Sequence, residues 1–208
     1  MIYIYGDSHV SSFVINNNIN YIVELNKHIK KNNFIVYRFE PYTCYNLINK
    51  SEYILSILKN NNNKDDIIFF NFGEVDIRCH IGFFENNNIE ILIENCIDRY
   101  LLFLLYIKQF FNNINVFGPI ASGIDNGMQG NGRPCYKTAY ERNKITELFT
   151  NILKKKCCDN NINFKSIFDN LQKDYNTIEE FYVDKIHLGF NAQKLLEKEF
   201  EDLEKKFN

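Results

Sequence analysis

The sequence predicts an α/β protein in which helices cover both faces of a parallel β-sheet of about five strands, a three-layer α/β/α sandwich. Five short apolar runs alternate with longer segments of helical periodicity, which is typical of consecutive βαβ units. These runs are continuously apolar, as expected for strands that are buried on both faces. With 208 residues the chain is short for two independent domains, so we expect one domain over residues 1–208.

Each element follows from a local pattern. The apolar runs predict strands over residues 1–5, 34–39, 67–72, 114–117 and 163–168. Apolar residues at helical spacing predict helices over residues 20–31, 45–59, 89–111, 136–157 and 188–207. Ligands of such folds bind at the carboxyl ends of the strands, so chemically active side chains should directly follow strands.

The composition argues against several kinds of partner. The net charge is −2 and no basic stretch is interleaved with aromatic residues, so neither nucleic acid nor an anionic membrane is an expected partner. The six cysteines contain no CxxC pair and are expected to be free thiols; we expect no metal and no cofactor. The first apolar run is too short for a signal peptide and no run is long enough to span a bilayer, so a cytoplasmic location is expected.

The first polar cluster, Gly6-Asp7-Ser8-His9, directly follows the first predicted strand. A serine at a strand-to-helix turn presents its hydroxyl at the edge of the sheet, where backbone N–H groups favour negative charge. Alternatively, Asp7 or Ser8 serves only as the N-cap of the next helix. His9 either contacts a substrate or faces solvent, and Asp7 is expected to hold the turn through backbone hydrogen bonds.

The second cluster spans residues 71–80, directly after the third predicted strand. It contains five polar or ionisable side chains, whereas a plain connection needs one capping residue: Asn71, Glu74, Asp76, Arg78 and His80. The alternative is a surface ion-pair cluster, which contributes little to stability. The position after a buried strand favours a functional site.

The third cluster, Asp184 to Gly189, precedes the last predicted helix. An aspartate three residues before a histidine can bring its carboxylate to Nδ1 of the ring. The carboxylate then fixes the tautomer and leaves Nε2 of His187 free for a serine. For an isolated DxxH the alternative is a simple turn with a capping histidine.

Together, the three clusters resemble the blocks of the SGNH/GDSL hydrolases. The GDS block corresponds to Gly6-Asp7-Ser8 and the DxxH block to Asp184 and His187, so the resemblance covers most of the chain. It implies a flavodoxin-like sandwich with Ser8 as the nucleophile. It also implies His187 as general base and later acid, and Asp184 as the carboxylate that orients it.

Two blocks depart from the family pattern. The common third block is GxND, but here Val75 stands at the position of the asparagine and cannot donate a hydrogen bond. The string resembles a GEIDxR variant starting at Gly73, in which we expect Glu74 to pair with Arg78. Arg78 is the first candidate for the missing oxyanion donor, and His80 and Asn71 are the next candidates.

The second block lacks its usual glycine after the second strand. Glu40-Pro41-Tyr42-Thr43 stands there, and the backbone N–H of Thr43 is a candidate donor. The non-periodic stretch over residues 118–134 is rich in Gly and Asn, and we expect it to determine substrate choice.

These features predict a serine-dependent ester hydrolase or acyltransferase that acts on a small-molecule or glycan ester, chiefly an O-acetylated carbohydrate. Val75 motivates an alternative, a glycan-binding module that has lost turnover. A third hypothesis is a flavodoxin-like nucleotide-binding protein. Phosphate binding would require a glycine-rich loop after the first strand, where the sequence has Gly6 alone.

Overall fold

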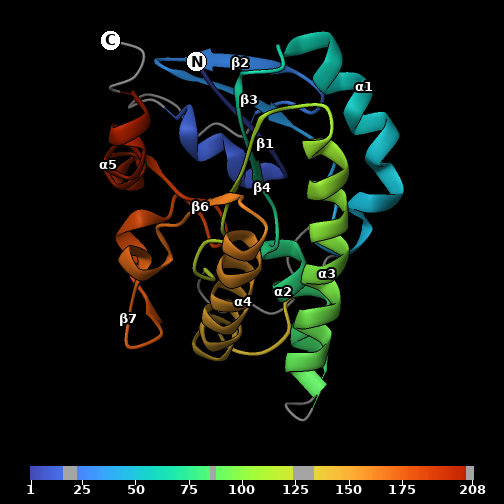
Figure 1. Ribbon diagram of the computed structural model, residues 1–208. Helices are drawn as coiled ribbons and strands as arrows, with labels where there is room; N and C mark the ends of the chain where they lie inside the picture. Colours follow the sequence, from blue (N-terminus) through green and yellow to red (C-terminus); the bar gives the residue numbers. More distant parts are fainter. Residues whose placement is uncertain (16–22, 85–87, 124–133, 205–208) are drawn as a thin grey trace.

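The computed structural model describes residues 1–15, 23–84, 88–123 and 134–204. At its centre is a six-stranded sheet in the order β2-β3-β1-β4-β5-β6 (Figure 1). The strands are β1 (Ile2–Gly6), β2 (His28–Lys31), β3 (Phe34–Arg38), β4 (Ile67–Asn71), β5 (Asn113–Phe117) and β6 (Asn163–Lys165). Neighbouring strands are parallel except for β2, which pairs antiparallel with β3. Without β2, the order β3-β1-β4-β5-β6 is the flavodoxin-like order 2-1-3-4-5.

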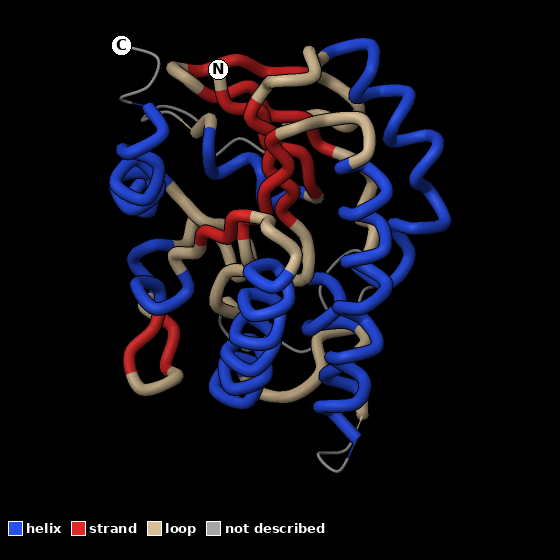
Figure 2. Tube along the Cα trace, in the orientation of Figure 1, coloured by secondary structure: helices blue, strands red, loops and turns tan. Residues whose placement is uncertain are grey.

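Helices cover both faces of the sheet, which confirms the predicted three-layer sandwich. The main helices are α1 (Ser51–Asn61), α3 (Ile89–Lys108), α4 (Ala139–Asp159) and α5 (Gln193–Glu204). Figure 1 shows α1 and α3 on one side of the strands and α5 on the opposite side, and Figure 2 shows the strands in red between these helical layers. The short 3-10 helix η1 (Ser8–Phe13) lies on the α5 side, where its apolar residues share a core with α5.

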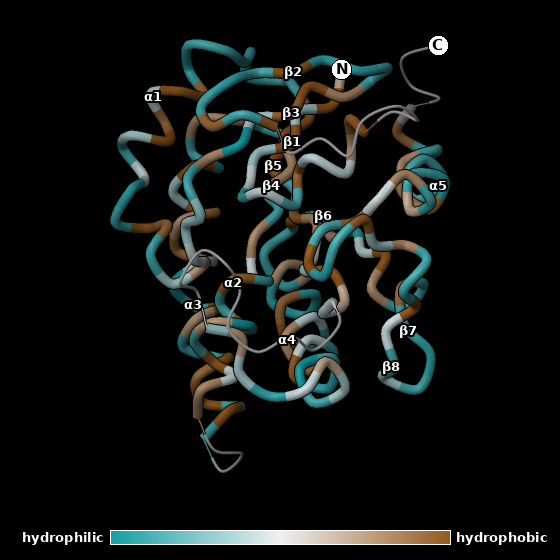
Figure 3. The backbone as a smooth tube through the Cα atoms, turned by 180° about the vertical axis from the view of Figure 1, so that it is seen from behind, coloured by the Kyte–Doolittle hydropathy of each residue, from teal (hydrophilic) through white to brown (hydrophobic). Residues whose placement is uncertain are grey.

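Each face of the sheet has its own hydrophobic core, because neighbouring residues of a strand point to opposite faces. Tyr5 and Phe70 belong to the core under α1, α3 and α4, whereas Ile4 and Phe69 belong to the core under η1 and α5. Figure 3 shows hydrophobic segments along the central strands and hydrophilic ones on the outer turns. Burial on both faces explains why the strands read as continuous apolar runs.

The register of the parallel strands sets the position of the site. Gly6, the last residue of β1, pairs with Arg38 of β3 and with Asn71 of β4, and Asn71 pairs with Phe117 of β5. Four strands therefore end at the same level, and the segments that follow them meet at one edge of the sheet.

The predicted helix over residues 20–31 is wrong in its described part. Residues 28–31 form the edge strand β2, which runs antiparallel to β3 and leads into it through a turn at Asn32, where φ is +52°. Leu25 makes an isolated bridge with Arg38. The helical spacing of a few apolar residues is outweighed by the hydrogen bonds that the open edge of β3 offers.

The other predicted elements differ mainly at their ends. The predicted helix over residues 45–59 starts as the 3-10 helix η2 (Cys44–Lys50) before α1. The last helix, predicted from residue 188, begins at Gln193, because the 3-10 helix η7 (Phe190–Ala192) takes up the preceding residues. Another 3-10 helix, η6 (Glu179–Phe181), lies before it in the chain. The remaining elements are α2 (Glu74–Cys79), η3 (Ile81–Phe83), η5 (Phe168–Leu171), β7 (Gln172–Lys173) and β8 (Asn176–Thr177). Within the described ranges, no helix is long and apolar enough to cross a membrane.

Candidate active site

Ser8 stands at the carboxyl edge of the sheet because the chain turns sharply after β1. A Cβ atom at Gly6 would lie 2.2 Å from the carbonyl oxygen of Asn71, so only glycine fits beside β4. Asp7 is the N-cap of η1 and accepts a hydrogen bond from the backbone N–H of His9 at 2.9 Å. This bond is the backbone contact that was expected of Asp7. Ser8 follows as the first residue of η1 and is half-buried.

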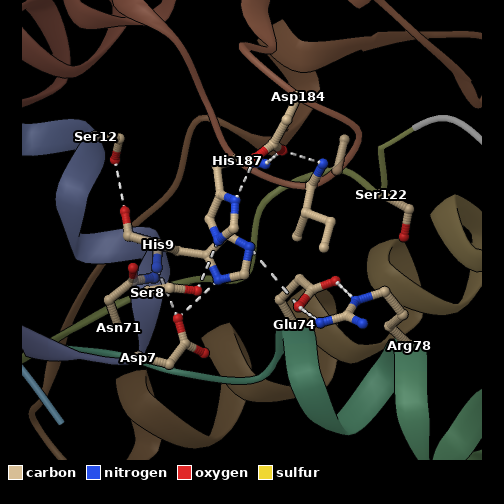
Figure 4. A network of polar contacts seen from close by, with 12 residues as sticks. Asp7, Ser8, His9, Ser12, Asn71, Glu74, Arg78, Ser122, Asp184 and His187 are labelled. Carbon is tan, nitrogen blue, oxygen red and sulfur yellow. Dashed lines mark hydrogen bonds and ion pairs between the residues drawn. The ribbon is translucent and has the colours of Figure 1, made fainter. Parts of the chain in front are cut away.

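The three residues of the predicted triad lie in one hydrogen-bonded chain (Figure 4). The Oγ atom of Ser8 is 2.8 Å from Nε2 of His187, and Nδ1 of His187 is 2.8 Å from Oδ2 of Asp184. The other carboxylate oxygen of Asp184 accepts the backbone N–H groups of Ile186 and His187, at 2.7 and 2.6 Å. These contacts bring together Ser8 and His187, which are 179 residues apart in the sequence.

The environment of Asp184 fixes the tautomer of His187. Burial raises the pKa of Asp184, but hydrogen bonds from the ring of His187 and from two backbone N–H groups outweigh it and hold the pKa well below its usual value. An ionised Asp184 only accepts hydrogen bonds, so Nδ1 of His187 carries a proton and Nε2 is free to accept the proton of Ser8.

The loop that carries Asp184 and His187 rests on the segment that follows β5. A Cβ atom at Gly123 would lie 1.8 Å from the carbonyl oxygen of Lys185, so the two backbones are in close contact. The hydroxyl of Tyr182 donates to the carbonyl of Ala121 at 2.5 Å. The described residues 118–123 of the predicted specificity loop therefore support the loop that carries His187, while residues 124–133 lie outside the described ranges.

The second cluster forms the turn after β4 and the helix α2. Gly73 has a φ of +119°, which favours glycine, and starts α2. Arg78 donates from Nε to Oε1 of Glu74 at 2.6 Å and from Nη2 to Oε2 at 3.1 Å, so the predicted pairing is present. Figure 4 shows Glu74 between Arg78 and His9, so the guanidinium lies on the far side of Glu74 from Ser8.

His9 is buried next to Ser8, so its solvent-facing alternative is wrong. Its ring contacts two carboxylates: Nδ1 is 2.7 Å from Oδ1 of Asp7, and Nε2 is 3.7 Å from Oε2 of Glu74. The centroids of the His9 and His187 rings are 5.3 Å apart. The only sequence signal for this network was the histidine directly after the GDS block; the contact with Glu74 joins residues 65 positions apart and has no local pattern.

The remaining predicted site residues take different positions. The side-chain amide of Asn71 donates to the carbonyls of Phe117 and Gly118, at 3.3 and 3.4 Å, and so ties the end of β4 to the end of β5. Thr43 and His80 instead line a cavity of about 600 Å³ between η2, η3 and α3. Its other lining residues include charged side chains as well as polar, aromatic and aliphatic ones: Tyr45, Asn46, Asp76, Ile81, Phe84, Leu92, Asn95, Cys96, Asp98, Arg99 and Leu102.

Asp76 connects the second block to the third. Its carboxylate accepts the backbone N–H groups of Cys44 and Tyr45, at 2.7 and 3.2 Å, and thereby caps the start of η2. It also accepts a hydrogen bond from the thiol of Cys96 at 3.2 Å. Burial raises the pKa of Asp76 to about 6, although the backbone N–H of Cys44 opposes this rise. Thr43, the residue before η2, is therefore held in place by a side chain of α2.

The six cysteines are free thiols, as predicted. Among the residues that the structure describes, no group of three or more His, Cys, Asp or Glu side chains could hold a metal ion.

Comparison with known proteins gives matches in structure alone. No family model matches the chain, and no curated protein matches it in sequence. Among solved structures, it is similar to a catalytic mutant of an acetylxylan esterase from Geobacillus stearothermophilus, with a TM-score of 0.59 and 12% identity over 97% of this chain and 92% of that one.

Two further solved structures show the same likeness. A lipase/acylhydrolase from Enterococcus faecalis has a TM-score of 0.57 and 12% identity, over 97% of this chain and 93% of that one. A phospholipase A1 from Streptomyces albidoflavus NA297 has a TM-score of 0.50 and 12% identity, over 95% and 98%. At this identity the likeness concerns the fold. The strand order, the positions of the sequence blocks and these neighbours together show that the chain has the SGNH/GDSL hydrolase fold.

Proposed function

We propose that the protein is a serine-dependent ester hydrolase or acyltransferase with Ser8, His187 and Asp184 as its catalytic triad. The single observation that carries the proposal is the unbroken hydrogen-bonded chain from Ser8 Oγ through His187 to Asp184, with 2.8 Å at each step. A serine that only caps a helix, or an aspartate that only stabilises a turn, would not require side-chain contacts with His187. The observed arrangement is the geometry that activates a serine nucleophile.

The reaction proceeds in two halves. Ser8 Oγ attacks the acyl carbonyl carbon while Nε2 of His187 takes the hydroxyl proton, and the carbonyl oxygen becomes an oxyanion. His187 then gives the proton to the leaving alcohol oxygen, and the acyl group stays on Ser8. In the second half, His187 takes a proton from water or from an acceptor hydroxyl, which attacks the acyl-serine. His187 then returns this proton to Ser8 Oγ as the bond between Oγ and the acyl carbon breaks and the acid or the new ester leaves. Asp184 remains ionised throughout and stabilises the imidazolium.

The substrate class that we favour is an O-acetylated carbohydrate. One structure of similar fold is that of an acetylxylan esterase. The cavity between η2, η3 and α3, which none of the three triad residues lines, offers the rings of Tyr45 and Phe84 together with polar side chains, among them Asn46 and Asn95. Aromatic faces pack against the C–H faces of a sugar ring while amide groups bind its hydroxyls, so this lining suits a carbohydrate.

The first experiment is intact mass spectrometry after treatment with a fluorophosphonate, followed by peptide mapping. We expect one adduct, on Ser8, which is abolished by His187→Ala and retained by His28→Ala. His28 is a matched control because it lies on the edge strand β2 and not in the triad. The unlabelled enzyme should release acetate from acetylated xylo-oligosaccharides, and labelling of Ser8 should abolish this activity.

The contrary outcome favours the second candidate. A folded wild-type protein that forms no adduct on Ser8 contradicts the hydrolase proposal. Glycan binding that survives Ser8→Ala would then support a binding module without turnover, for which Val75 in place of an oxyanion donor is the specific reason.

A further inference from the structure

Side chains hold the buried segment over residues 121–123, which follows β5 and has no regular secondary structure. Each of its three carbonyl groups accepts a hydrogen bond from a side chain of another segment. Two hydroxyl groups donate at 2.5 Å and a guanidinium at 3.2 Å: Tyr182 to Ala121, Thr177 to Ser122 and Arg142 to Gly123. Because buried carbonyl groups need donors, these side chains do here what a neighbouring strand does in a sheet.

Asn143 of α4 is the centre of this arrangement and is fully buried. Its Oδ1 accepts the backbone N–H of Ser122 at 2.7 Å, while Nδ2 donates to the carbonyl of Tyr175 at 2.8 Å and to Oγ1 of Thr177 at 3.0 Å. Oγ1 of Thr177 in turn donates to the carbonyl of Ser122. The side chains of Asn143 and Thr177 therefore fix both backbone polar groups of Ser122, and we call this pair the Ser122 clamp. Figure 4 shows Ser122 at the edge of the site.

The clamped segment lies directly against the turn that carries two residues of the triad. A Cβ atom at Gly123 would lie 1.8 Å from the carbonyl oxygen of Lys185 and 3.1 Å from the backbone nitrogen of Ile186. These are the two residues between Asp184 and His187, and the N–H of Ile186 is one of the donors that hold the carboxylate of Asp184. A shift of the clamped segment would therefore displace the turn.

A structural alternative is that the clamp only fastens the hairpin of β7 and β8 to α4. That hairpin has another attachment, because the hydroxyl of Tyr175 donates to Oε2 of Glu147 on α4 at 2.9 Å. The clamp, in contrast, directs one acceptor and one donor at the backbone of Ser122. Two buried side chains are thus devoted to one residue of an irregular segment, which favours a role at the neighbouring turn.

We propose that the Ser122 clamp positions His187 for proton transfer from Ser8. The inference rests on the proposed function. The clamp keeps its segment in place against the turn, and the turn keeps Nε2 of His187 at 2.8 Å from Oγ of Ser8. A misplacement of about 1 Å in such a site costs about 100-fold in rate. The two side chains of the clamp are positioning residues, which act through backbone contacts and touch no reacting atom.

Three substitutions separate positioning from a loss of stability. Thr177→Val opens the clamp with little change in shape, and Thr177→Ser keeps the hydroxyl. Thr146→Val is the matched control, because the buried hydroxyl of Thr146 donates within α4, to the carbonyl of Arg142 at 2.9 Å. We expect kcat for 4-nitrophenyl acetate, per serine titrated with fluorophosphonate, to fall about 10-fold or more in Thr177→Val with little change in KM. The other two variants should stay within about 2-fold of wild type, and equal kcat values for the two valine variants would overturn the inference.

A spectroscopic readout reports the geometry without turnover. In protein labelled with 15N-histidine, the proton on Nδ1 of His187 should resonate at low field, because it lies in a hydrogen bond of 2.8 Å to Asp184; His187→Ala identifies the signal. Thr177→Val should shift this signal or speed its exchange with water, whereas Thr146→Val should not. An unchanged signal in Thr177→Val would overturn the inference even if the wild type is an active esterase. A shifted signal in a protein without fluorophosphonate reactivity would refute the proposed function and support the effect of the clamp on His187.

Hydrogen exchange in the wild-type protein keeps the test independent of how the variants fold. The backbone N–H of Ser122 donates to a buried side chain, so it should exchange as slowly as the buried N–H groups of α4. Exchange of Ser122 at the rate of an unprotected loop amide would overturn the inference.

Discussion

The replacement Gly6→Ala tests the geometry on which the whole site depends. The added Cβ atom would lie 2.2 Å from the carbonyl oxygen of Asn71 and 2.7 Å from Cγ1 of Val10. The oxygen belongs to the backbone of β4 and cannot rotate away, so β1 must move by roughly 1 Å to restore an ordinary contact. Overpacking of this kind costs about 3 kcal/mol, the upper end of the usual range.

The expected effects follow from that shift. For a chain of this length about 3 kcal/mol corresponds to a fall in Tm of about 6 to 12 °C, measurable by calorimetry. A displacement of about 1 Å at the nucleophile costs about 100-fold in rate, measurable as the rate of fluorophosphonate labelling of Ser8.

Gly82→Ala is the matched control. There the nearest atom to an added Cβ is the carbonyl oxygen of Ile77 at 3.0 Å, so the fall in Tm should be less than half as large and Ser8 should label at the wild-type rate. If Gly6→Ala melts within 2 °C of wild type, a threshold of about 1 kcal/mol, and labels normally, the close approach of β1 and β4 at Gly6 is refuted.

Three further changes test separate parts of the site. Asp184→Asn should lower kcat about 10⁴-fold, because an amide no longer holds the tautomer of His187; a loss below about 10-fold in a steady-state assay would contradict the assigned role. The pKa of Asp76 is raised from 3.8 to about 6, so the folded state binds this proton more tightly and its contribution to stability falls as the pH rises from about 4 to about 6. Asp76→Asn should remove that fall, which is roughly 3 kcal/mol. The difference in free energy of unfolding between variant and wild type, measured with urea, should therefore change between pH 4 and pH 7; the same difference at both pH values would refute this. Leu92→Trp should fill the cavity and raise KM for an acetylated oligosaccharide about 10-fold or more, whereas Ile91→Trp, exposed and outside the cavity lining, should not; equal KM values would place the substrate elsewhere.

Much of the fold was predictable because the buried parallel strands carry strong local patterns. Each predicted strand is present, and the GDS and DxxH blocks stand where parallel strands end and the last helix begins. The edge strand β2 escaped prediction, since an edge strand of four residues is stabilised by its partner β3 and not by its own sequence.

The triad geometry was within reach of the sequence, whereas its surroundings were not. Asp184 and His187 lie three residues apart, so one turn fixes their relation. The contacts of His9 with Glu74, and of Asp76 with the start of η2, join segments that are distant in the chain. Such contacts depend on how α2 packs beneath the turn after β1, which no local spacing encodes. For this reason Arg78 was expected at the oxyanion, whereas the structure places Glu74 between it and His9.

The separation of Ser8 and His187 by 179 residues has a consequence for biosynthesis. The nucleophile is translated 179 residues before its general base. A nascent chain therefore carries an inert serine until the segment with Asp184 and His187 has been translated and has docked beside Ser8. Covalent labelling of Ser8 consequently reports completed folding, and a library of truncated or destabilised chains could be sorted by that single chemical signal.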